Sequence, residues 1–348
     1  MQFKIAMLLL IGVLFAPASR AFAKGPPAEA LPIREAEQGP IDFETKGIGE
    51  LSGIAYVGGD RFAVVSDKGG KLGFVTIDID RETGAIASAT LEQTALLEGG
   101  RDLEDLALHA TGCLLHAVDE SDQSLVAYRF PSLERVETLA VPDVFKQARP
   151  NLGFEALAAT HDACIWIANE EPLKTDGPRA TDTARGLVRL QHFGPDMRPG
   201  PQHAYPVDPH RGSDNLIERA QSGVVGLVAL PNGKLVAMER ELGGPVIPTF
   251  RIRLYLIDTA GATDTSEIDA LDTDQIAPVR KQLLFETNAG AVNFEGIALG
   301  PKLDNGDFVL LLVSDNGGEK RMPQRLLALR LSGELAKPAP ESAIDQGE

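Results

Sequence analysis

Short apolar runs recur in pairs along the chain, and the pairs share one pattern of hydrophobic and polar positions. The first run opens with an acidic or small residue and contains Ala or Gly, and the second run ends in or near an acid. Runs of this length, bounded by turn residues, are typical of β-strands. The five pairs are residues 50–55 with 61–67, 102–107 with 113–120, 151–158 with 164–170, 222–229 with 234–239, and 293–298 with 308–315.

Further strands of alternating or β-branched character follow each pair, so the repeat is predicted to be a four-stranded antiparallel sheet. Third strands are expected at residues 73–78, 124–128, 186–190, 251–257 and 325–330, and fourth strands at 135–141, 202–207 and 279–285. The fifth repeat lacks a fourth strand, which the segment near Ile41–Phe43 is predicted to supply. Closing the ring in this way removes exposed sheet edges. The pattern therefore predicts an all-β protein, a five-bladed β-propeller, with six blades as the nearest alternative.

The N-terminus has the pattern of a cleaved export signal. Lys4 precedes an apolar stretch from Ile5 to Phe15, and Ala21–Ala23 forms a small-x-small cleavage site. We expect residues 1–23 to be a signal peptide, 24–35 a linker, 36–333 the propeller domain and 334–348 a disordered tail. No later stretch reaches the roughly 20 apolar residues that a membrane span needs. The predicted location is the periplasm or the medium.

Charge narrows the range of partners. The formal net charge is −17, and removing the predicted signal with Lys4 and Arg20 takes it to −17 − 2 = −19. Nucleic acids and anionic membranes require clustered Lys and Arg, so neither is an expected partner. We expect a monomer that acts on a small molecule.

The two cysteines and three long insertions complete the picture of the chain. Cys113 and Cys164 begin the second strands of neighbouring repeats, where their side chains run parallel and do not converge, so free thiols are favoured over a disulfide. Residues 171–184 and 208–220 are polar insertions around the third repeat. The acidic insertion 260–275 lacks EF-hand spacing and is predicted to be a solvated loop.

Acidic residues recur at the start of the innermost strand and at the end of the next. Because these two strands are antiparallel, both acids lie at the same end of a blade, and the ring collects all copies around one axis. Such a cluster needs bound cations, basic partners or wide separation in water. The alternative is that each acid caps a strand end. The candidates are Glu50, Asp67, Asp102, Glu104, Asp119, Glu155, Glu170, Glu239, Glu295 and Asp315.

A metal ion and basic side chains are both predicted at the same end of the propeller as the acids. Oxygen-only ligands favour Ca²⁺ over zinc, and the expected ligands are Asp67, Glu104, Glu155, Glu170, Glu295 and Asp315. A metal ion beside Arg or Lys suits a phosphate, because both stabilise developing negative charge. Arg240 could equally form a local ion pair with Glu239. The expected substrate-binding residues are Lys68, Arg101, Arg240 and Lys281.

At these residues the chain resembles the phytase-like family, described as having esterase-like activity of phytase. The motifs are Leu51-Ser-Gly-Ile-Ala55, Val65-Ser-Asp67, Asp102-Leu-Glu-Asp105, Gly153-Phe-Glu-Ala-Leu157, Ala237-Met-Glu-Arg240, Lys281-Gln-Leu-Leu284, Asn293-Phe-Glu-Gly-Ile297 and Val313-Ser-Asp-Asn316. The resemblance covers about residues 45–332 and implies an exported repeat-built β protein with a phosphoester-hydrolase role. The fourth repeat departs from the pattern, with Val224-Val225-Gly226 where others carry Glu.

The leading hypothesis is a metal-dependent phosphoesterase with Glu155, Glu239, Arg240 and Lys281 as catalytic residues. Ca²⁺ would polarise the phosphoryl oxygen, while Arg240 and Lys281 would bind the phosphate. A Ca²⁺-dependent lactonase or carboxylic-ester hydrolase and a non-catalytic binding propeller remain open alternatives, because fold alone does not decide function.

Overall fold

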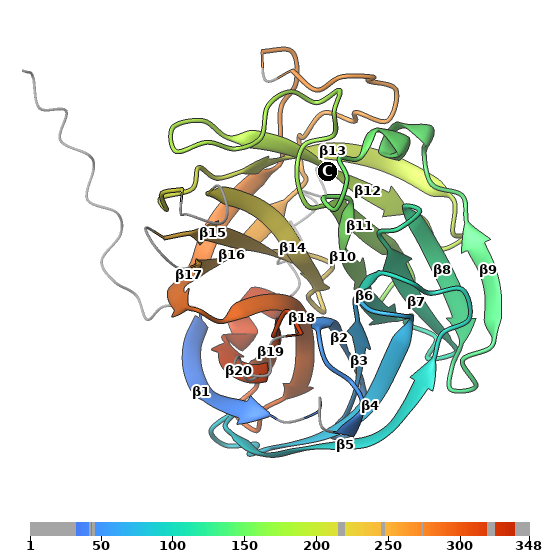
Figure 1. The fold of residues 1–348 in the computed structure, drawn as a ribbon, viewed down its shortest axis with the longest axis vertical. Helices are drawn as coiled ribbons and strands as arrows, with labels where there is room; N and C mark the ends of the chain where they lie inside the picture. The colour runs from blue at the N-terminus through green and yellow to red at the C-terminus, as the bar shows by residue number, and fades with distance from the viewer. Residues whose placement is uncertain are drawn as a thin grey trace, which may run out of the picture. The chain divides into compact units, whose positions relative to one another are not determined.

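Five four-stranded antiparallel sheets form a ring in the computed structural model, and the protein is a five-bladed β-propeller. Strands β2, β6, β10, β14 and β18 are innermost, and each contacts its two neighbours around the axis (Figure 1). The described residues are 33–41, 43, 46–214, 220–244, 248–272, 274–318 and 324–337. The prediction of five blades is confirmed, and the six-bladed alternative is excluded.

Each blade is a meander whose four strands follow one another from the axis outward. Blade 1 contains β2 (Leu51–Gly58), β3 (Arg61–Ser66), β4 (Lys71–Ile79) and β5 (Ile86–Leu96). Blade 2 contains β6 (Leu103–Leu108), β7 (Leu114–Asp119), β8 (Ser124–Arg129) and β9 (Arg135–Leu139). Blade 3 contains β10 (Phe154–Ala159), β11 (Ile165–Asn169), β12 (Gly186–Phe193) and β13 (Pro199–Val207). Blade 4 contains β14 (Gln221–Ala229), β15 (Leu235–Gly243), β16 (Thr249–Asp258) and β17 (Arg280–Gly290).

Blade 5 joins the two ends of the described chain. It contains β18 (Asn293–Lys302), β19 (Phe308–Asp315), β20 (Gln324–Leu331) and β1 (Ile33–Ile41). Strand β1 pairs antiparallel with β20, from Ile33 opposite Leu331 to Ile41 opposite Gln324. The predicted closure by an N-terminal strand is confirmed, and it gives the last sheet its fourth strand.

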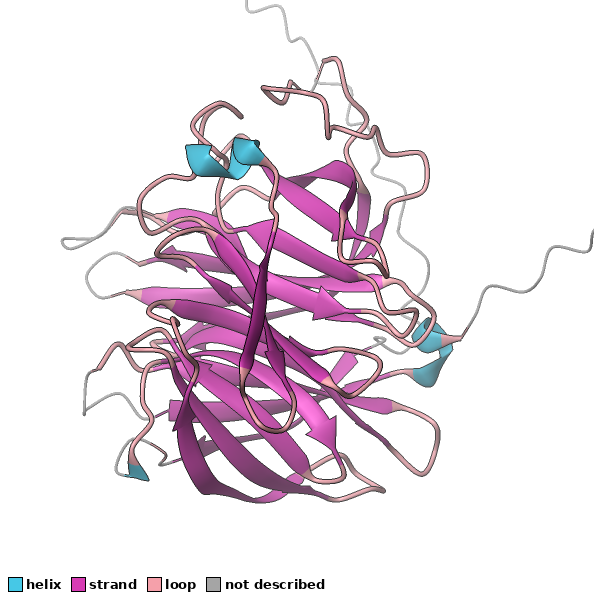
Figure 2. Cartoon of the chain, turned by 90° about the vertical axis from the view of Figure 1, so that its right-hand side faces the viewer, coloured by secondary structure: helices cyan, strands magenta, loops and turns pink. Residues whose placement is uncertain are grey.

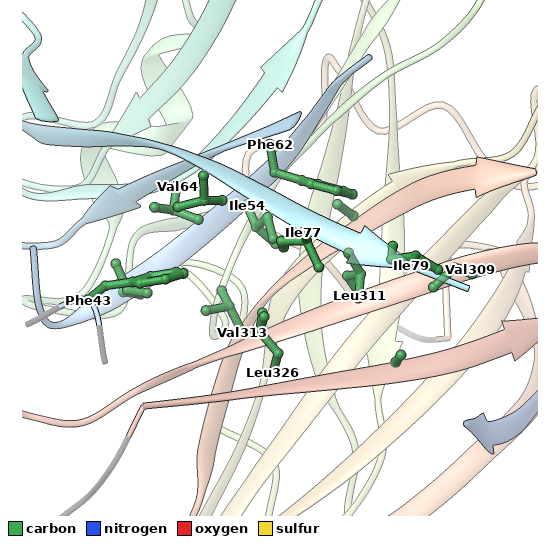
Figure 3. Close-up of a cluster of buried hydrophobic side chains, with 14 of the residues drawn as sticks. Phe43, Ile54, Phe62, Val64, Ile77, Ile79, Val309, Leu311, Val313 and Leu326 are labelled. Carbon is green, nitrogen blue, oxygen red and sulfur yellow. The ribbon is translucent and has the colours of Figure 1, made fainter. Parts of the chain in front are cut away.

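Strand alternation explains why the second strand of each blade is apolar on both faces. In β3, Phe62 and Val64 pack into the layer between blades 1 and 5, whereas Ala63 and Val65 pack toward blade 2. Successive side chains of a strand point to opposite faces, and both faces are covered in a propeller. Figure 3 shows the first of these layers, in which Ile54 and Ile77 of blade 1 lie near Leu311 and Val313 of blade 5.

Helices contribute little to the described chain. Two short 3₁₀ helices, η2 (Asp143–Gln147) and η3 (Gly333–Ala336), are the larger cyan segments beside the magenta sheets of Figure 2. Among the described residues, no helix is long and apolar enough to cross a membrane.

The N-terminal and C-terminal predictions concern segments that are mostly outside the described residues. The signal peptide 1–23, residues 24–32 of the linker and the tail beyond residue 337 lie there, so these assignments stay predictions. The predicted boundaries at 36 and 333 are too narrow, because residues 33–35 of the linker belong to β1 and residues 334–336 of the tail belong to η3. Both thiols are free, with Cys113 exposed and Cys164 buried, as the strand directions predicted.

The insertions around blade 3 are anchored by one buried ion pair. Arg189 of β12 donates to Asp176 through Nη2 at 2.6 Å and Nε at 2.7 Å, and both side chains are fully buried. Arg189 also donates to the carbonyl of Ile268 in the acidic insertion, and Leu271 packs beside β12 and β13. The acidic insertion 260–275 therefore packs on blade 3 through its apolar residues. Its acids are exposed, as expected of a solvated loop; they include Glu267, Asp269, Asp272 and Asp274.

His116 makes folding stability depend on pH. It is fully buried in β7, and neither ring nitrogen has a hydrogen-bond partner among the described residues. Burial, followed by the neighbouring His109, lowers the pKa of His116 to about 4 from an ordinary value of 6.5. The fold therefore favours neutral His116, so its contribution is complete above pH 6.5 and is lost as the pH falls toward 4.

We expect this histidine to lower the free energy of unfolding by about 2 kcal/mol between pH 7 and pH 5. Urea titrations of the unmodified protein and a His116→Leu variant at both pH values measure it. The part of the pH dependence of the unfolding free energy that is absent from the variant is due to His116. An equal pH dependence in both proteins would contradict the assignment.

Candidate functional site

A β-bulge occurs at the same position in all five innermost strands. The register shifts lie between Leu51 and Gly53, Leu103 and Asp105, Phe154 and Ala156, Val224 and Gly226, and Phe294 and Gly296. A bulge leaves one residue out of the ladder and re-aims its side chain. The bulged residues are Ser52, Glu104, Glu155, Val225 and Glu295.

A second ring of equivalent positions lies at the end of the second strand in four blades and within β15, which continues to Gly243, in blade 4. In each blade, the residue before the bulge pairs with a residue of the second strand. The ring position is the next residue of the chain after that partner. The amides of Asp67, Glu120 and Glu170 donate to the carbonyls of Glu50, Asp102 and Gly153, which fixes the equivalence. The five positions are Asp67, Glu120, Glu170, Arg240 and Asp315. Blade 4 thus replaces an acid with Arg240 and a bulged glutamate with Val225.

Seven of the ten positions in the two rings line a cavity of about 220 Å³, and the exceptions are Ser52, Val225 and Glu120. All six predicted metal ligands line it, so residues far apart in sequence are brought together as the repeat predicted. Its lining also contains Lys68 and Arg240, two of the four basic residues predicted to bind substrate. The lining residues are Asp67, Lys68, Asp102, Glu104, Asn151, Leu152, Glu155, Glu170, Gln221, Arg240, Glu295 and Asp315.

Glu104 and Glu155 are buried carboxylates without a hydrogen-bond partner among the described residues. Each is 8% exposed, and no donor among the described residues forms a hydrogen bond to either side chain. Burial, and then the Glu295 and Glu120 carboxylates, raise the pKa of Glu104 well above its usual range. Burial, and then Glu104, do the same to the pKa of Glu155. Ionising two buried carboxyl groups that lack donors is costly unless a cation joins them.

Arg240 contributes a positive charge to the other side of the cavity. It donates to Glu170 at 2.6 Å, to the Asn293 side-chain oxygen at 3.1 Å, and to Glu295. Burial raises the pKa of Glu295 to about 8, although Arg240 acts in the opposite direction. The alternative of a local ion pair between Arg240 and Glu239 is wrong, because the partners of Arg240 are Glu170 and Glu295.

A cluster of three acids lies on the side of blade 2, and one of them, Glu120, accepts from the Gly153 amide. Carboxylate oxygens of Asp102, Glu104 and Glu120 lie within 4.8 Å of one another, an arrangement that could hold a metal ion. Glu120 is not among the acids predicted from the sequence, whereas its neighbour Asp119 is. Asp119 instead accepts from the Arg101 amide at 2.7 Å and the Ser121 amide at 2.9 Å, and so caps a strand end. Only the strand pairing shows that Glu120, and not Asp119, is the counterpart of Glu170.

Three further candidates do not line the cavity. Arg101 is exposed and pairs with Asp122 at 2.8 Å, which leaves its guanidinium outside the cavity. The backbone amide of Glu50 donates to the Asn316 side chain at 3.1 Å. Asp119 has the capping role described above.

Glu239 and Lys281 form a separate buried cluster in blade 4. Lys281 pairs with Glu239 and, at 3.1 Å, with Asp208, and its ammonium lies 4.0 Å from the ring centroid of Tyr255. Glu239 also accepts from the Tyr205 hydroxyl at 2.9 Å. Neither residue lines the cavity, so the structure does not bring these two predicted catalytic residues to the carboxylate ring.

Comparison with known families identifies the chain. The family described as "Phytase-like: Esterase-like activity of phytase" matches residues 46–318, the span that contains all of the cavity lining. The chain belongs to this family. A search of curated proteins found no match to this phytase-like chain.

Solved structures resemble the phytase-like propeller only distantly. Aldose sugar dehydrogenase from Streptomyces coelicolor, in its PQQ-bound form, is 16% identical, with 88% of this chain and 99% of that chain covered and a TM-score of 0.44. Glutaminyl cyclase from Myxococcus xanthus is 12% identical, with coverages of 86% and 95% and a TM-score of 0.42. Kuenenia stuttgartiensis hydrazine synthase is 10% identical with a TM-score of 0.36, and the match spans 78% of this chain but 57% of that one. Likeness at these levels carries no functional information.

Proposed function

We propose that this phytase-like propeller is a metal-dependent phosphoesterase that works in the carboxylate cavity. The observation that carries the proposal is the pair Glu104 and Glu155, which are nine-tenths buried, line the cavity and lack a donor among the described residues. The cluster of Asp102, Glu104 and Glu120 beside them could hold a metal ion. Membership of the phytase-like family supports an ester, and specifically a phosphoester, as the substrate.

The chemistry of the lining favours a hard inorganic cation, and we infer Ca²⁺. None of the lining residues is His, Cys or an aromatic, so the described cavity offers oxygen ligands and no surface for an organic ammonium group. Ca²⁺ accepts six to eight oxygen ligands in flexible geometry. Asp102, Glu104, Glu120 and Glu155 would hold it, opposite the Arg240 side.

In this proposal the cation and three side chains have different roles in the reaction. A bound divalent cation supplies Lewis-acid polarisation of a phosphoryl oxygen and acidifies water. Glu155, once ionised, can accept a proton from the attacking water. Arg240 is held in place by two carboxylates and contributes a fixed positive charge. Lys68, whose side chain is 60% exposed, attracts an anionic substrate at the cavity.

The test measures metal content, turnover and chelator sensitivity on one preparation. Purified protein is assayed with p-nitrophenyl phosphate, bis-p-nitrophenyl phosphate, phytate and a panel of lactones, with and without chelator. Chelator-sensitive phosphate release is the expected result. Turnover of lactones alone would replace the proposal with an ester hydrolase, and no turnover by folded protein would favour a binding propeller.

Ca²⁺ is also expected to stabilise the fold. At a free concentration one hundred times the dissociation constant, binding to the native state alone adds about 2.7 kcal/mol. A rise in melting temperature with CaCl₂, reversed by EGTA, checks this expectation. The Glu104→Gln variant should lose the rise, whereas Glu267→Gln, at an exposed acid of the insertion, should keep it. An unchanged melting temperature in the unmodified protein would count against the cation site.

We also infer that the protein is exported after cleavage at Ala23, on the pattern of residues 1–23. The N-terminal sequence of protein recovered from the periplasm or medium should begin at Lys24. Recovery of only uncleaved protein in the cytoplasm would contradict export.

A further inference from the structure

The residue that follows each bulge is small in four of the five blades. These residues are Gly53, Ala156, Gly226 and Gly296, and the exception is Asp105 in blade 2. Small residues are required because the innermost strands nearly touch at this level. A Cβ on Gly296 would lie 3.0 Å from the Gly53 Cα, and one on Gly226 would lie 2.7 Å from the Ile297 side chain. An aspartate at this level therefore needs a specific explanation.

Asp105 is inserted between the innermost strands of neighbouring blades. It is 1% exposed, and its Oδ1 accepts from the Leu106 amide at 2.8 Å. Its Oδ2 accepts from the Leu157 amide, also at 2.8 Å, and this hydrogen bond crosses from β6 of blade 2 to β10 of blade 3. On the other side, a Cβ on Gly53 would lie 2.7 Å from the Asp105 Cα. The side chain is thus fixed by three strands.

The crossing hydrogen bond joins the two bulges that carry the unpartnered glutamates. Asp105 directly follows Glu104, and Leu157 lies two residues after Glu155. Neither glutamate has a hydrogen-bond donor among the described residues that could hold its carboxylate in place. Their separation is therefore set by the relative position of the two strands. The Asp105 side chain makes the direct hydrogen bond from β6 to β10 on the C-terminal side of Glu155, whereas Glu120 and Gln123, which follow β7, accept from the Gly153 and Phe154 amides on its N-terminal side.

We infer that Asp105 is a positioning residue that sets the spacing of Glu104 and Glu155 for cation binding. The inference rests on the proposed function, since it assumes that these glutamates bind a cation. Asp105 does not itself line the cavity and touches no substrate. Groups that orient metal ligands from behind typically change metal affinity by about 10- to 100-fold when they are replaced.

Calorimetric titration with CaCl₂ of the purified, exported form of the protein tests the inference. Asp105→Asn keeps the shape of the side chain and one of its two acceptor oxygens, but it places the side-chain NH₂ group against a backbone N–H. Asp105→Ala removes both acceptor oxygens. We expect the dissociation constant for Ca²⁺ to rise about 10-fold or more in the Ala variant and by a smaller factor in the Asn variant. Tyr128→Phe is the matched control, because it removes one hydrogen bond of blade 2 away from the cavity, from the Tyr128 hydroxyl of β8 to the Glu98 carbonyl in the loop between β5 and β6, at 3.1 Å.

A purely structural role for Asp105 would lower the melting temperature of the cation-free protein without changing the dissociation constant measured well below that temperature. Equal Ca²⁺ affinity in the unmodified protein and both Asp105 variants would overturn the inference and leave the proposed function intact. Failure of the unmodified protein to bind Ca²⁺ would overturn the proposed function, and the inference with it. Weaker binding in the Asp105 variants, with unchanged binding by Tyr128→Phe, would support the positioning role.

Discussion

Replacing Glu155 by Gln is expected to lower the turnover of p-nitrophenyl phosphate by about 100-fold or more, the usual effect of removing a general base. Glu155 is the bulged residue of β10, lines the cavity and lacks a donor among the described residues. The amide keeps the size of the side chain but can neither accept a proton from water nor bind a cation as an anion. Steady-state kinetics at saturating Ca²⁺ measure the loss.

The same substitution should not destabilise the cation-free protein. Burial and the Glu104 carboxylate raise the pKa of Glu155, which means that its ionised form is disfavoured in the folded state. A neutral residue removes that repulsion, so the melting temperature without Ca²⁺ should stay level or rise, as is common when an active-site residue is replaced. Glu137→Gln, at an exposed position of β9, is the control and should change neither quantity. Full activity of Glu155→Gln would exclude this residue and weaken the case for the cavity.

The architecture could be predicted from sequence because each blade repeats the same alternation of apolar residues. Strands such as β3 are apolar on both faces, since each face packs against a neighbouring blade, and this makes the repeat visible without an alignment. Antiparallel pairing then places the acids of every repeat at one end of the channel. All six predicted metal ligands line the cavity for that reason.

The bulges could not be predicted, because a register shift depends on pairing with the neighbouring strand. Without the bulge, the simple alternation of β6 does not show that Glu104 leaves the ladder. The same shift determines which of two adjacent acids is equivalent to Asp67, so the repeat pattern alone points to Asp119 where Glu120 is the structural counterpart. The positions of single acids thus depend on a feature that only coordinates reveal.

The position of Glu239 is a different case, because strand geometry separates it from Arg240. Glu239 and Arg240 are consecutive residues of β15, and consecutive side chains of a strand point in opposite directions. Arg240 contacts the cavity acids Glu170 and Glu295, so Glu239 has to point away from them. Both residues could not serve the same site.

Replacing Lys281 by Met should therefore affect stability far more than catalysis. The Lys281 side chain is 6% exposed, pairs with Glu239 and Asp208, and places its ammonium 4.0 Å from the centroid of Tyr255. Met retains the aliphatic stem that packs between Tyr205 and Tyr255 but leaves Glu239, which is 1% exposed, with only Arg253 at 3.5 Å as a cationic partner among the described residues. Breaking a buried ion pair by removing one member costs about 3–5 kcal/mol, because an uncompensated charge remains. Urea denaturation should show a loss of unfolding free energy in this range, while the Ca²⁺ affinity and the Michaelis constant of the folded variant stay unchanged.

Lys234→Met makes the same chemical change at an exposed turn and should cost less than about 1 kcal/mol. A Lys281→Met protein of normal stability with a greatly raised Michaelis constant would instead restore Lys281 to the phosphate-binding role that the sequence predicted.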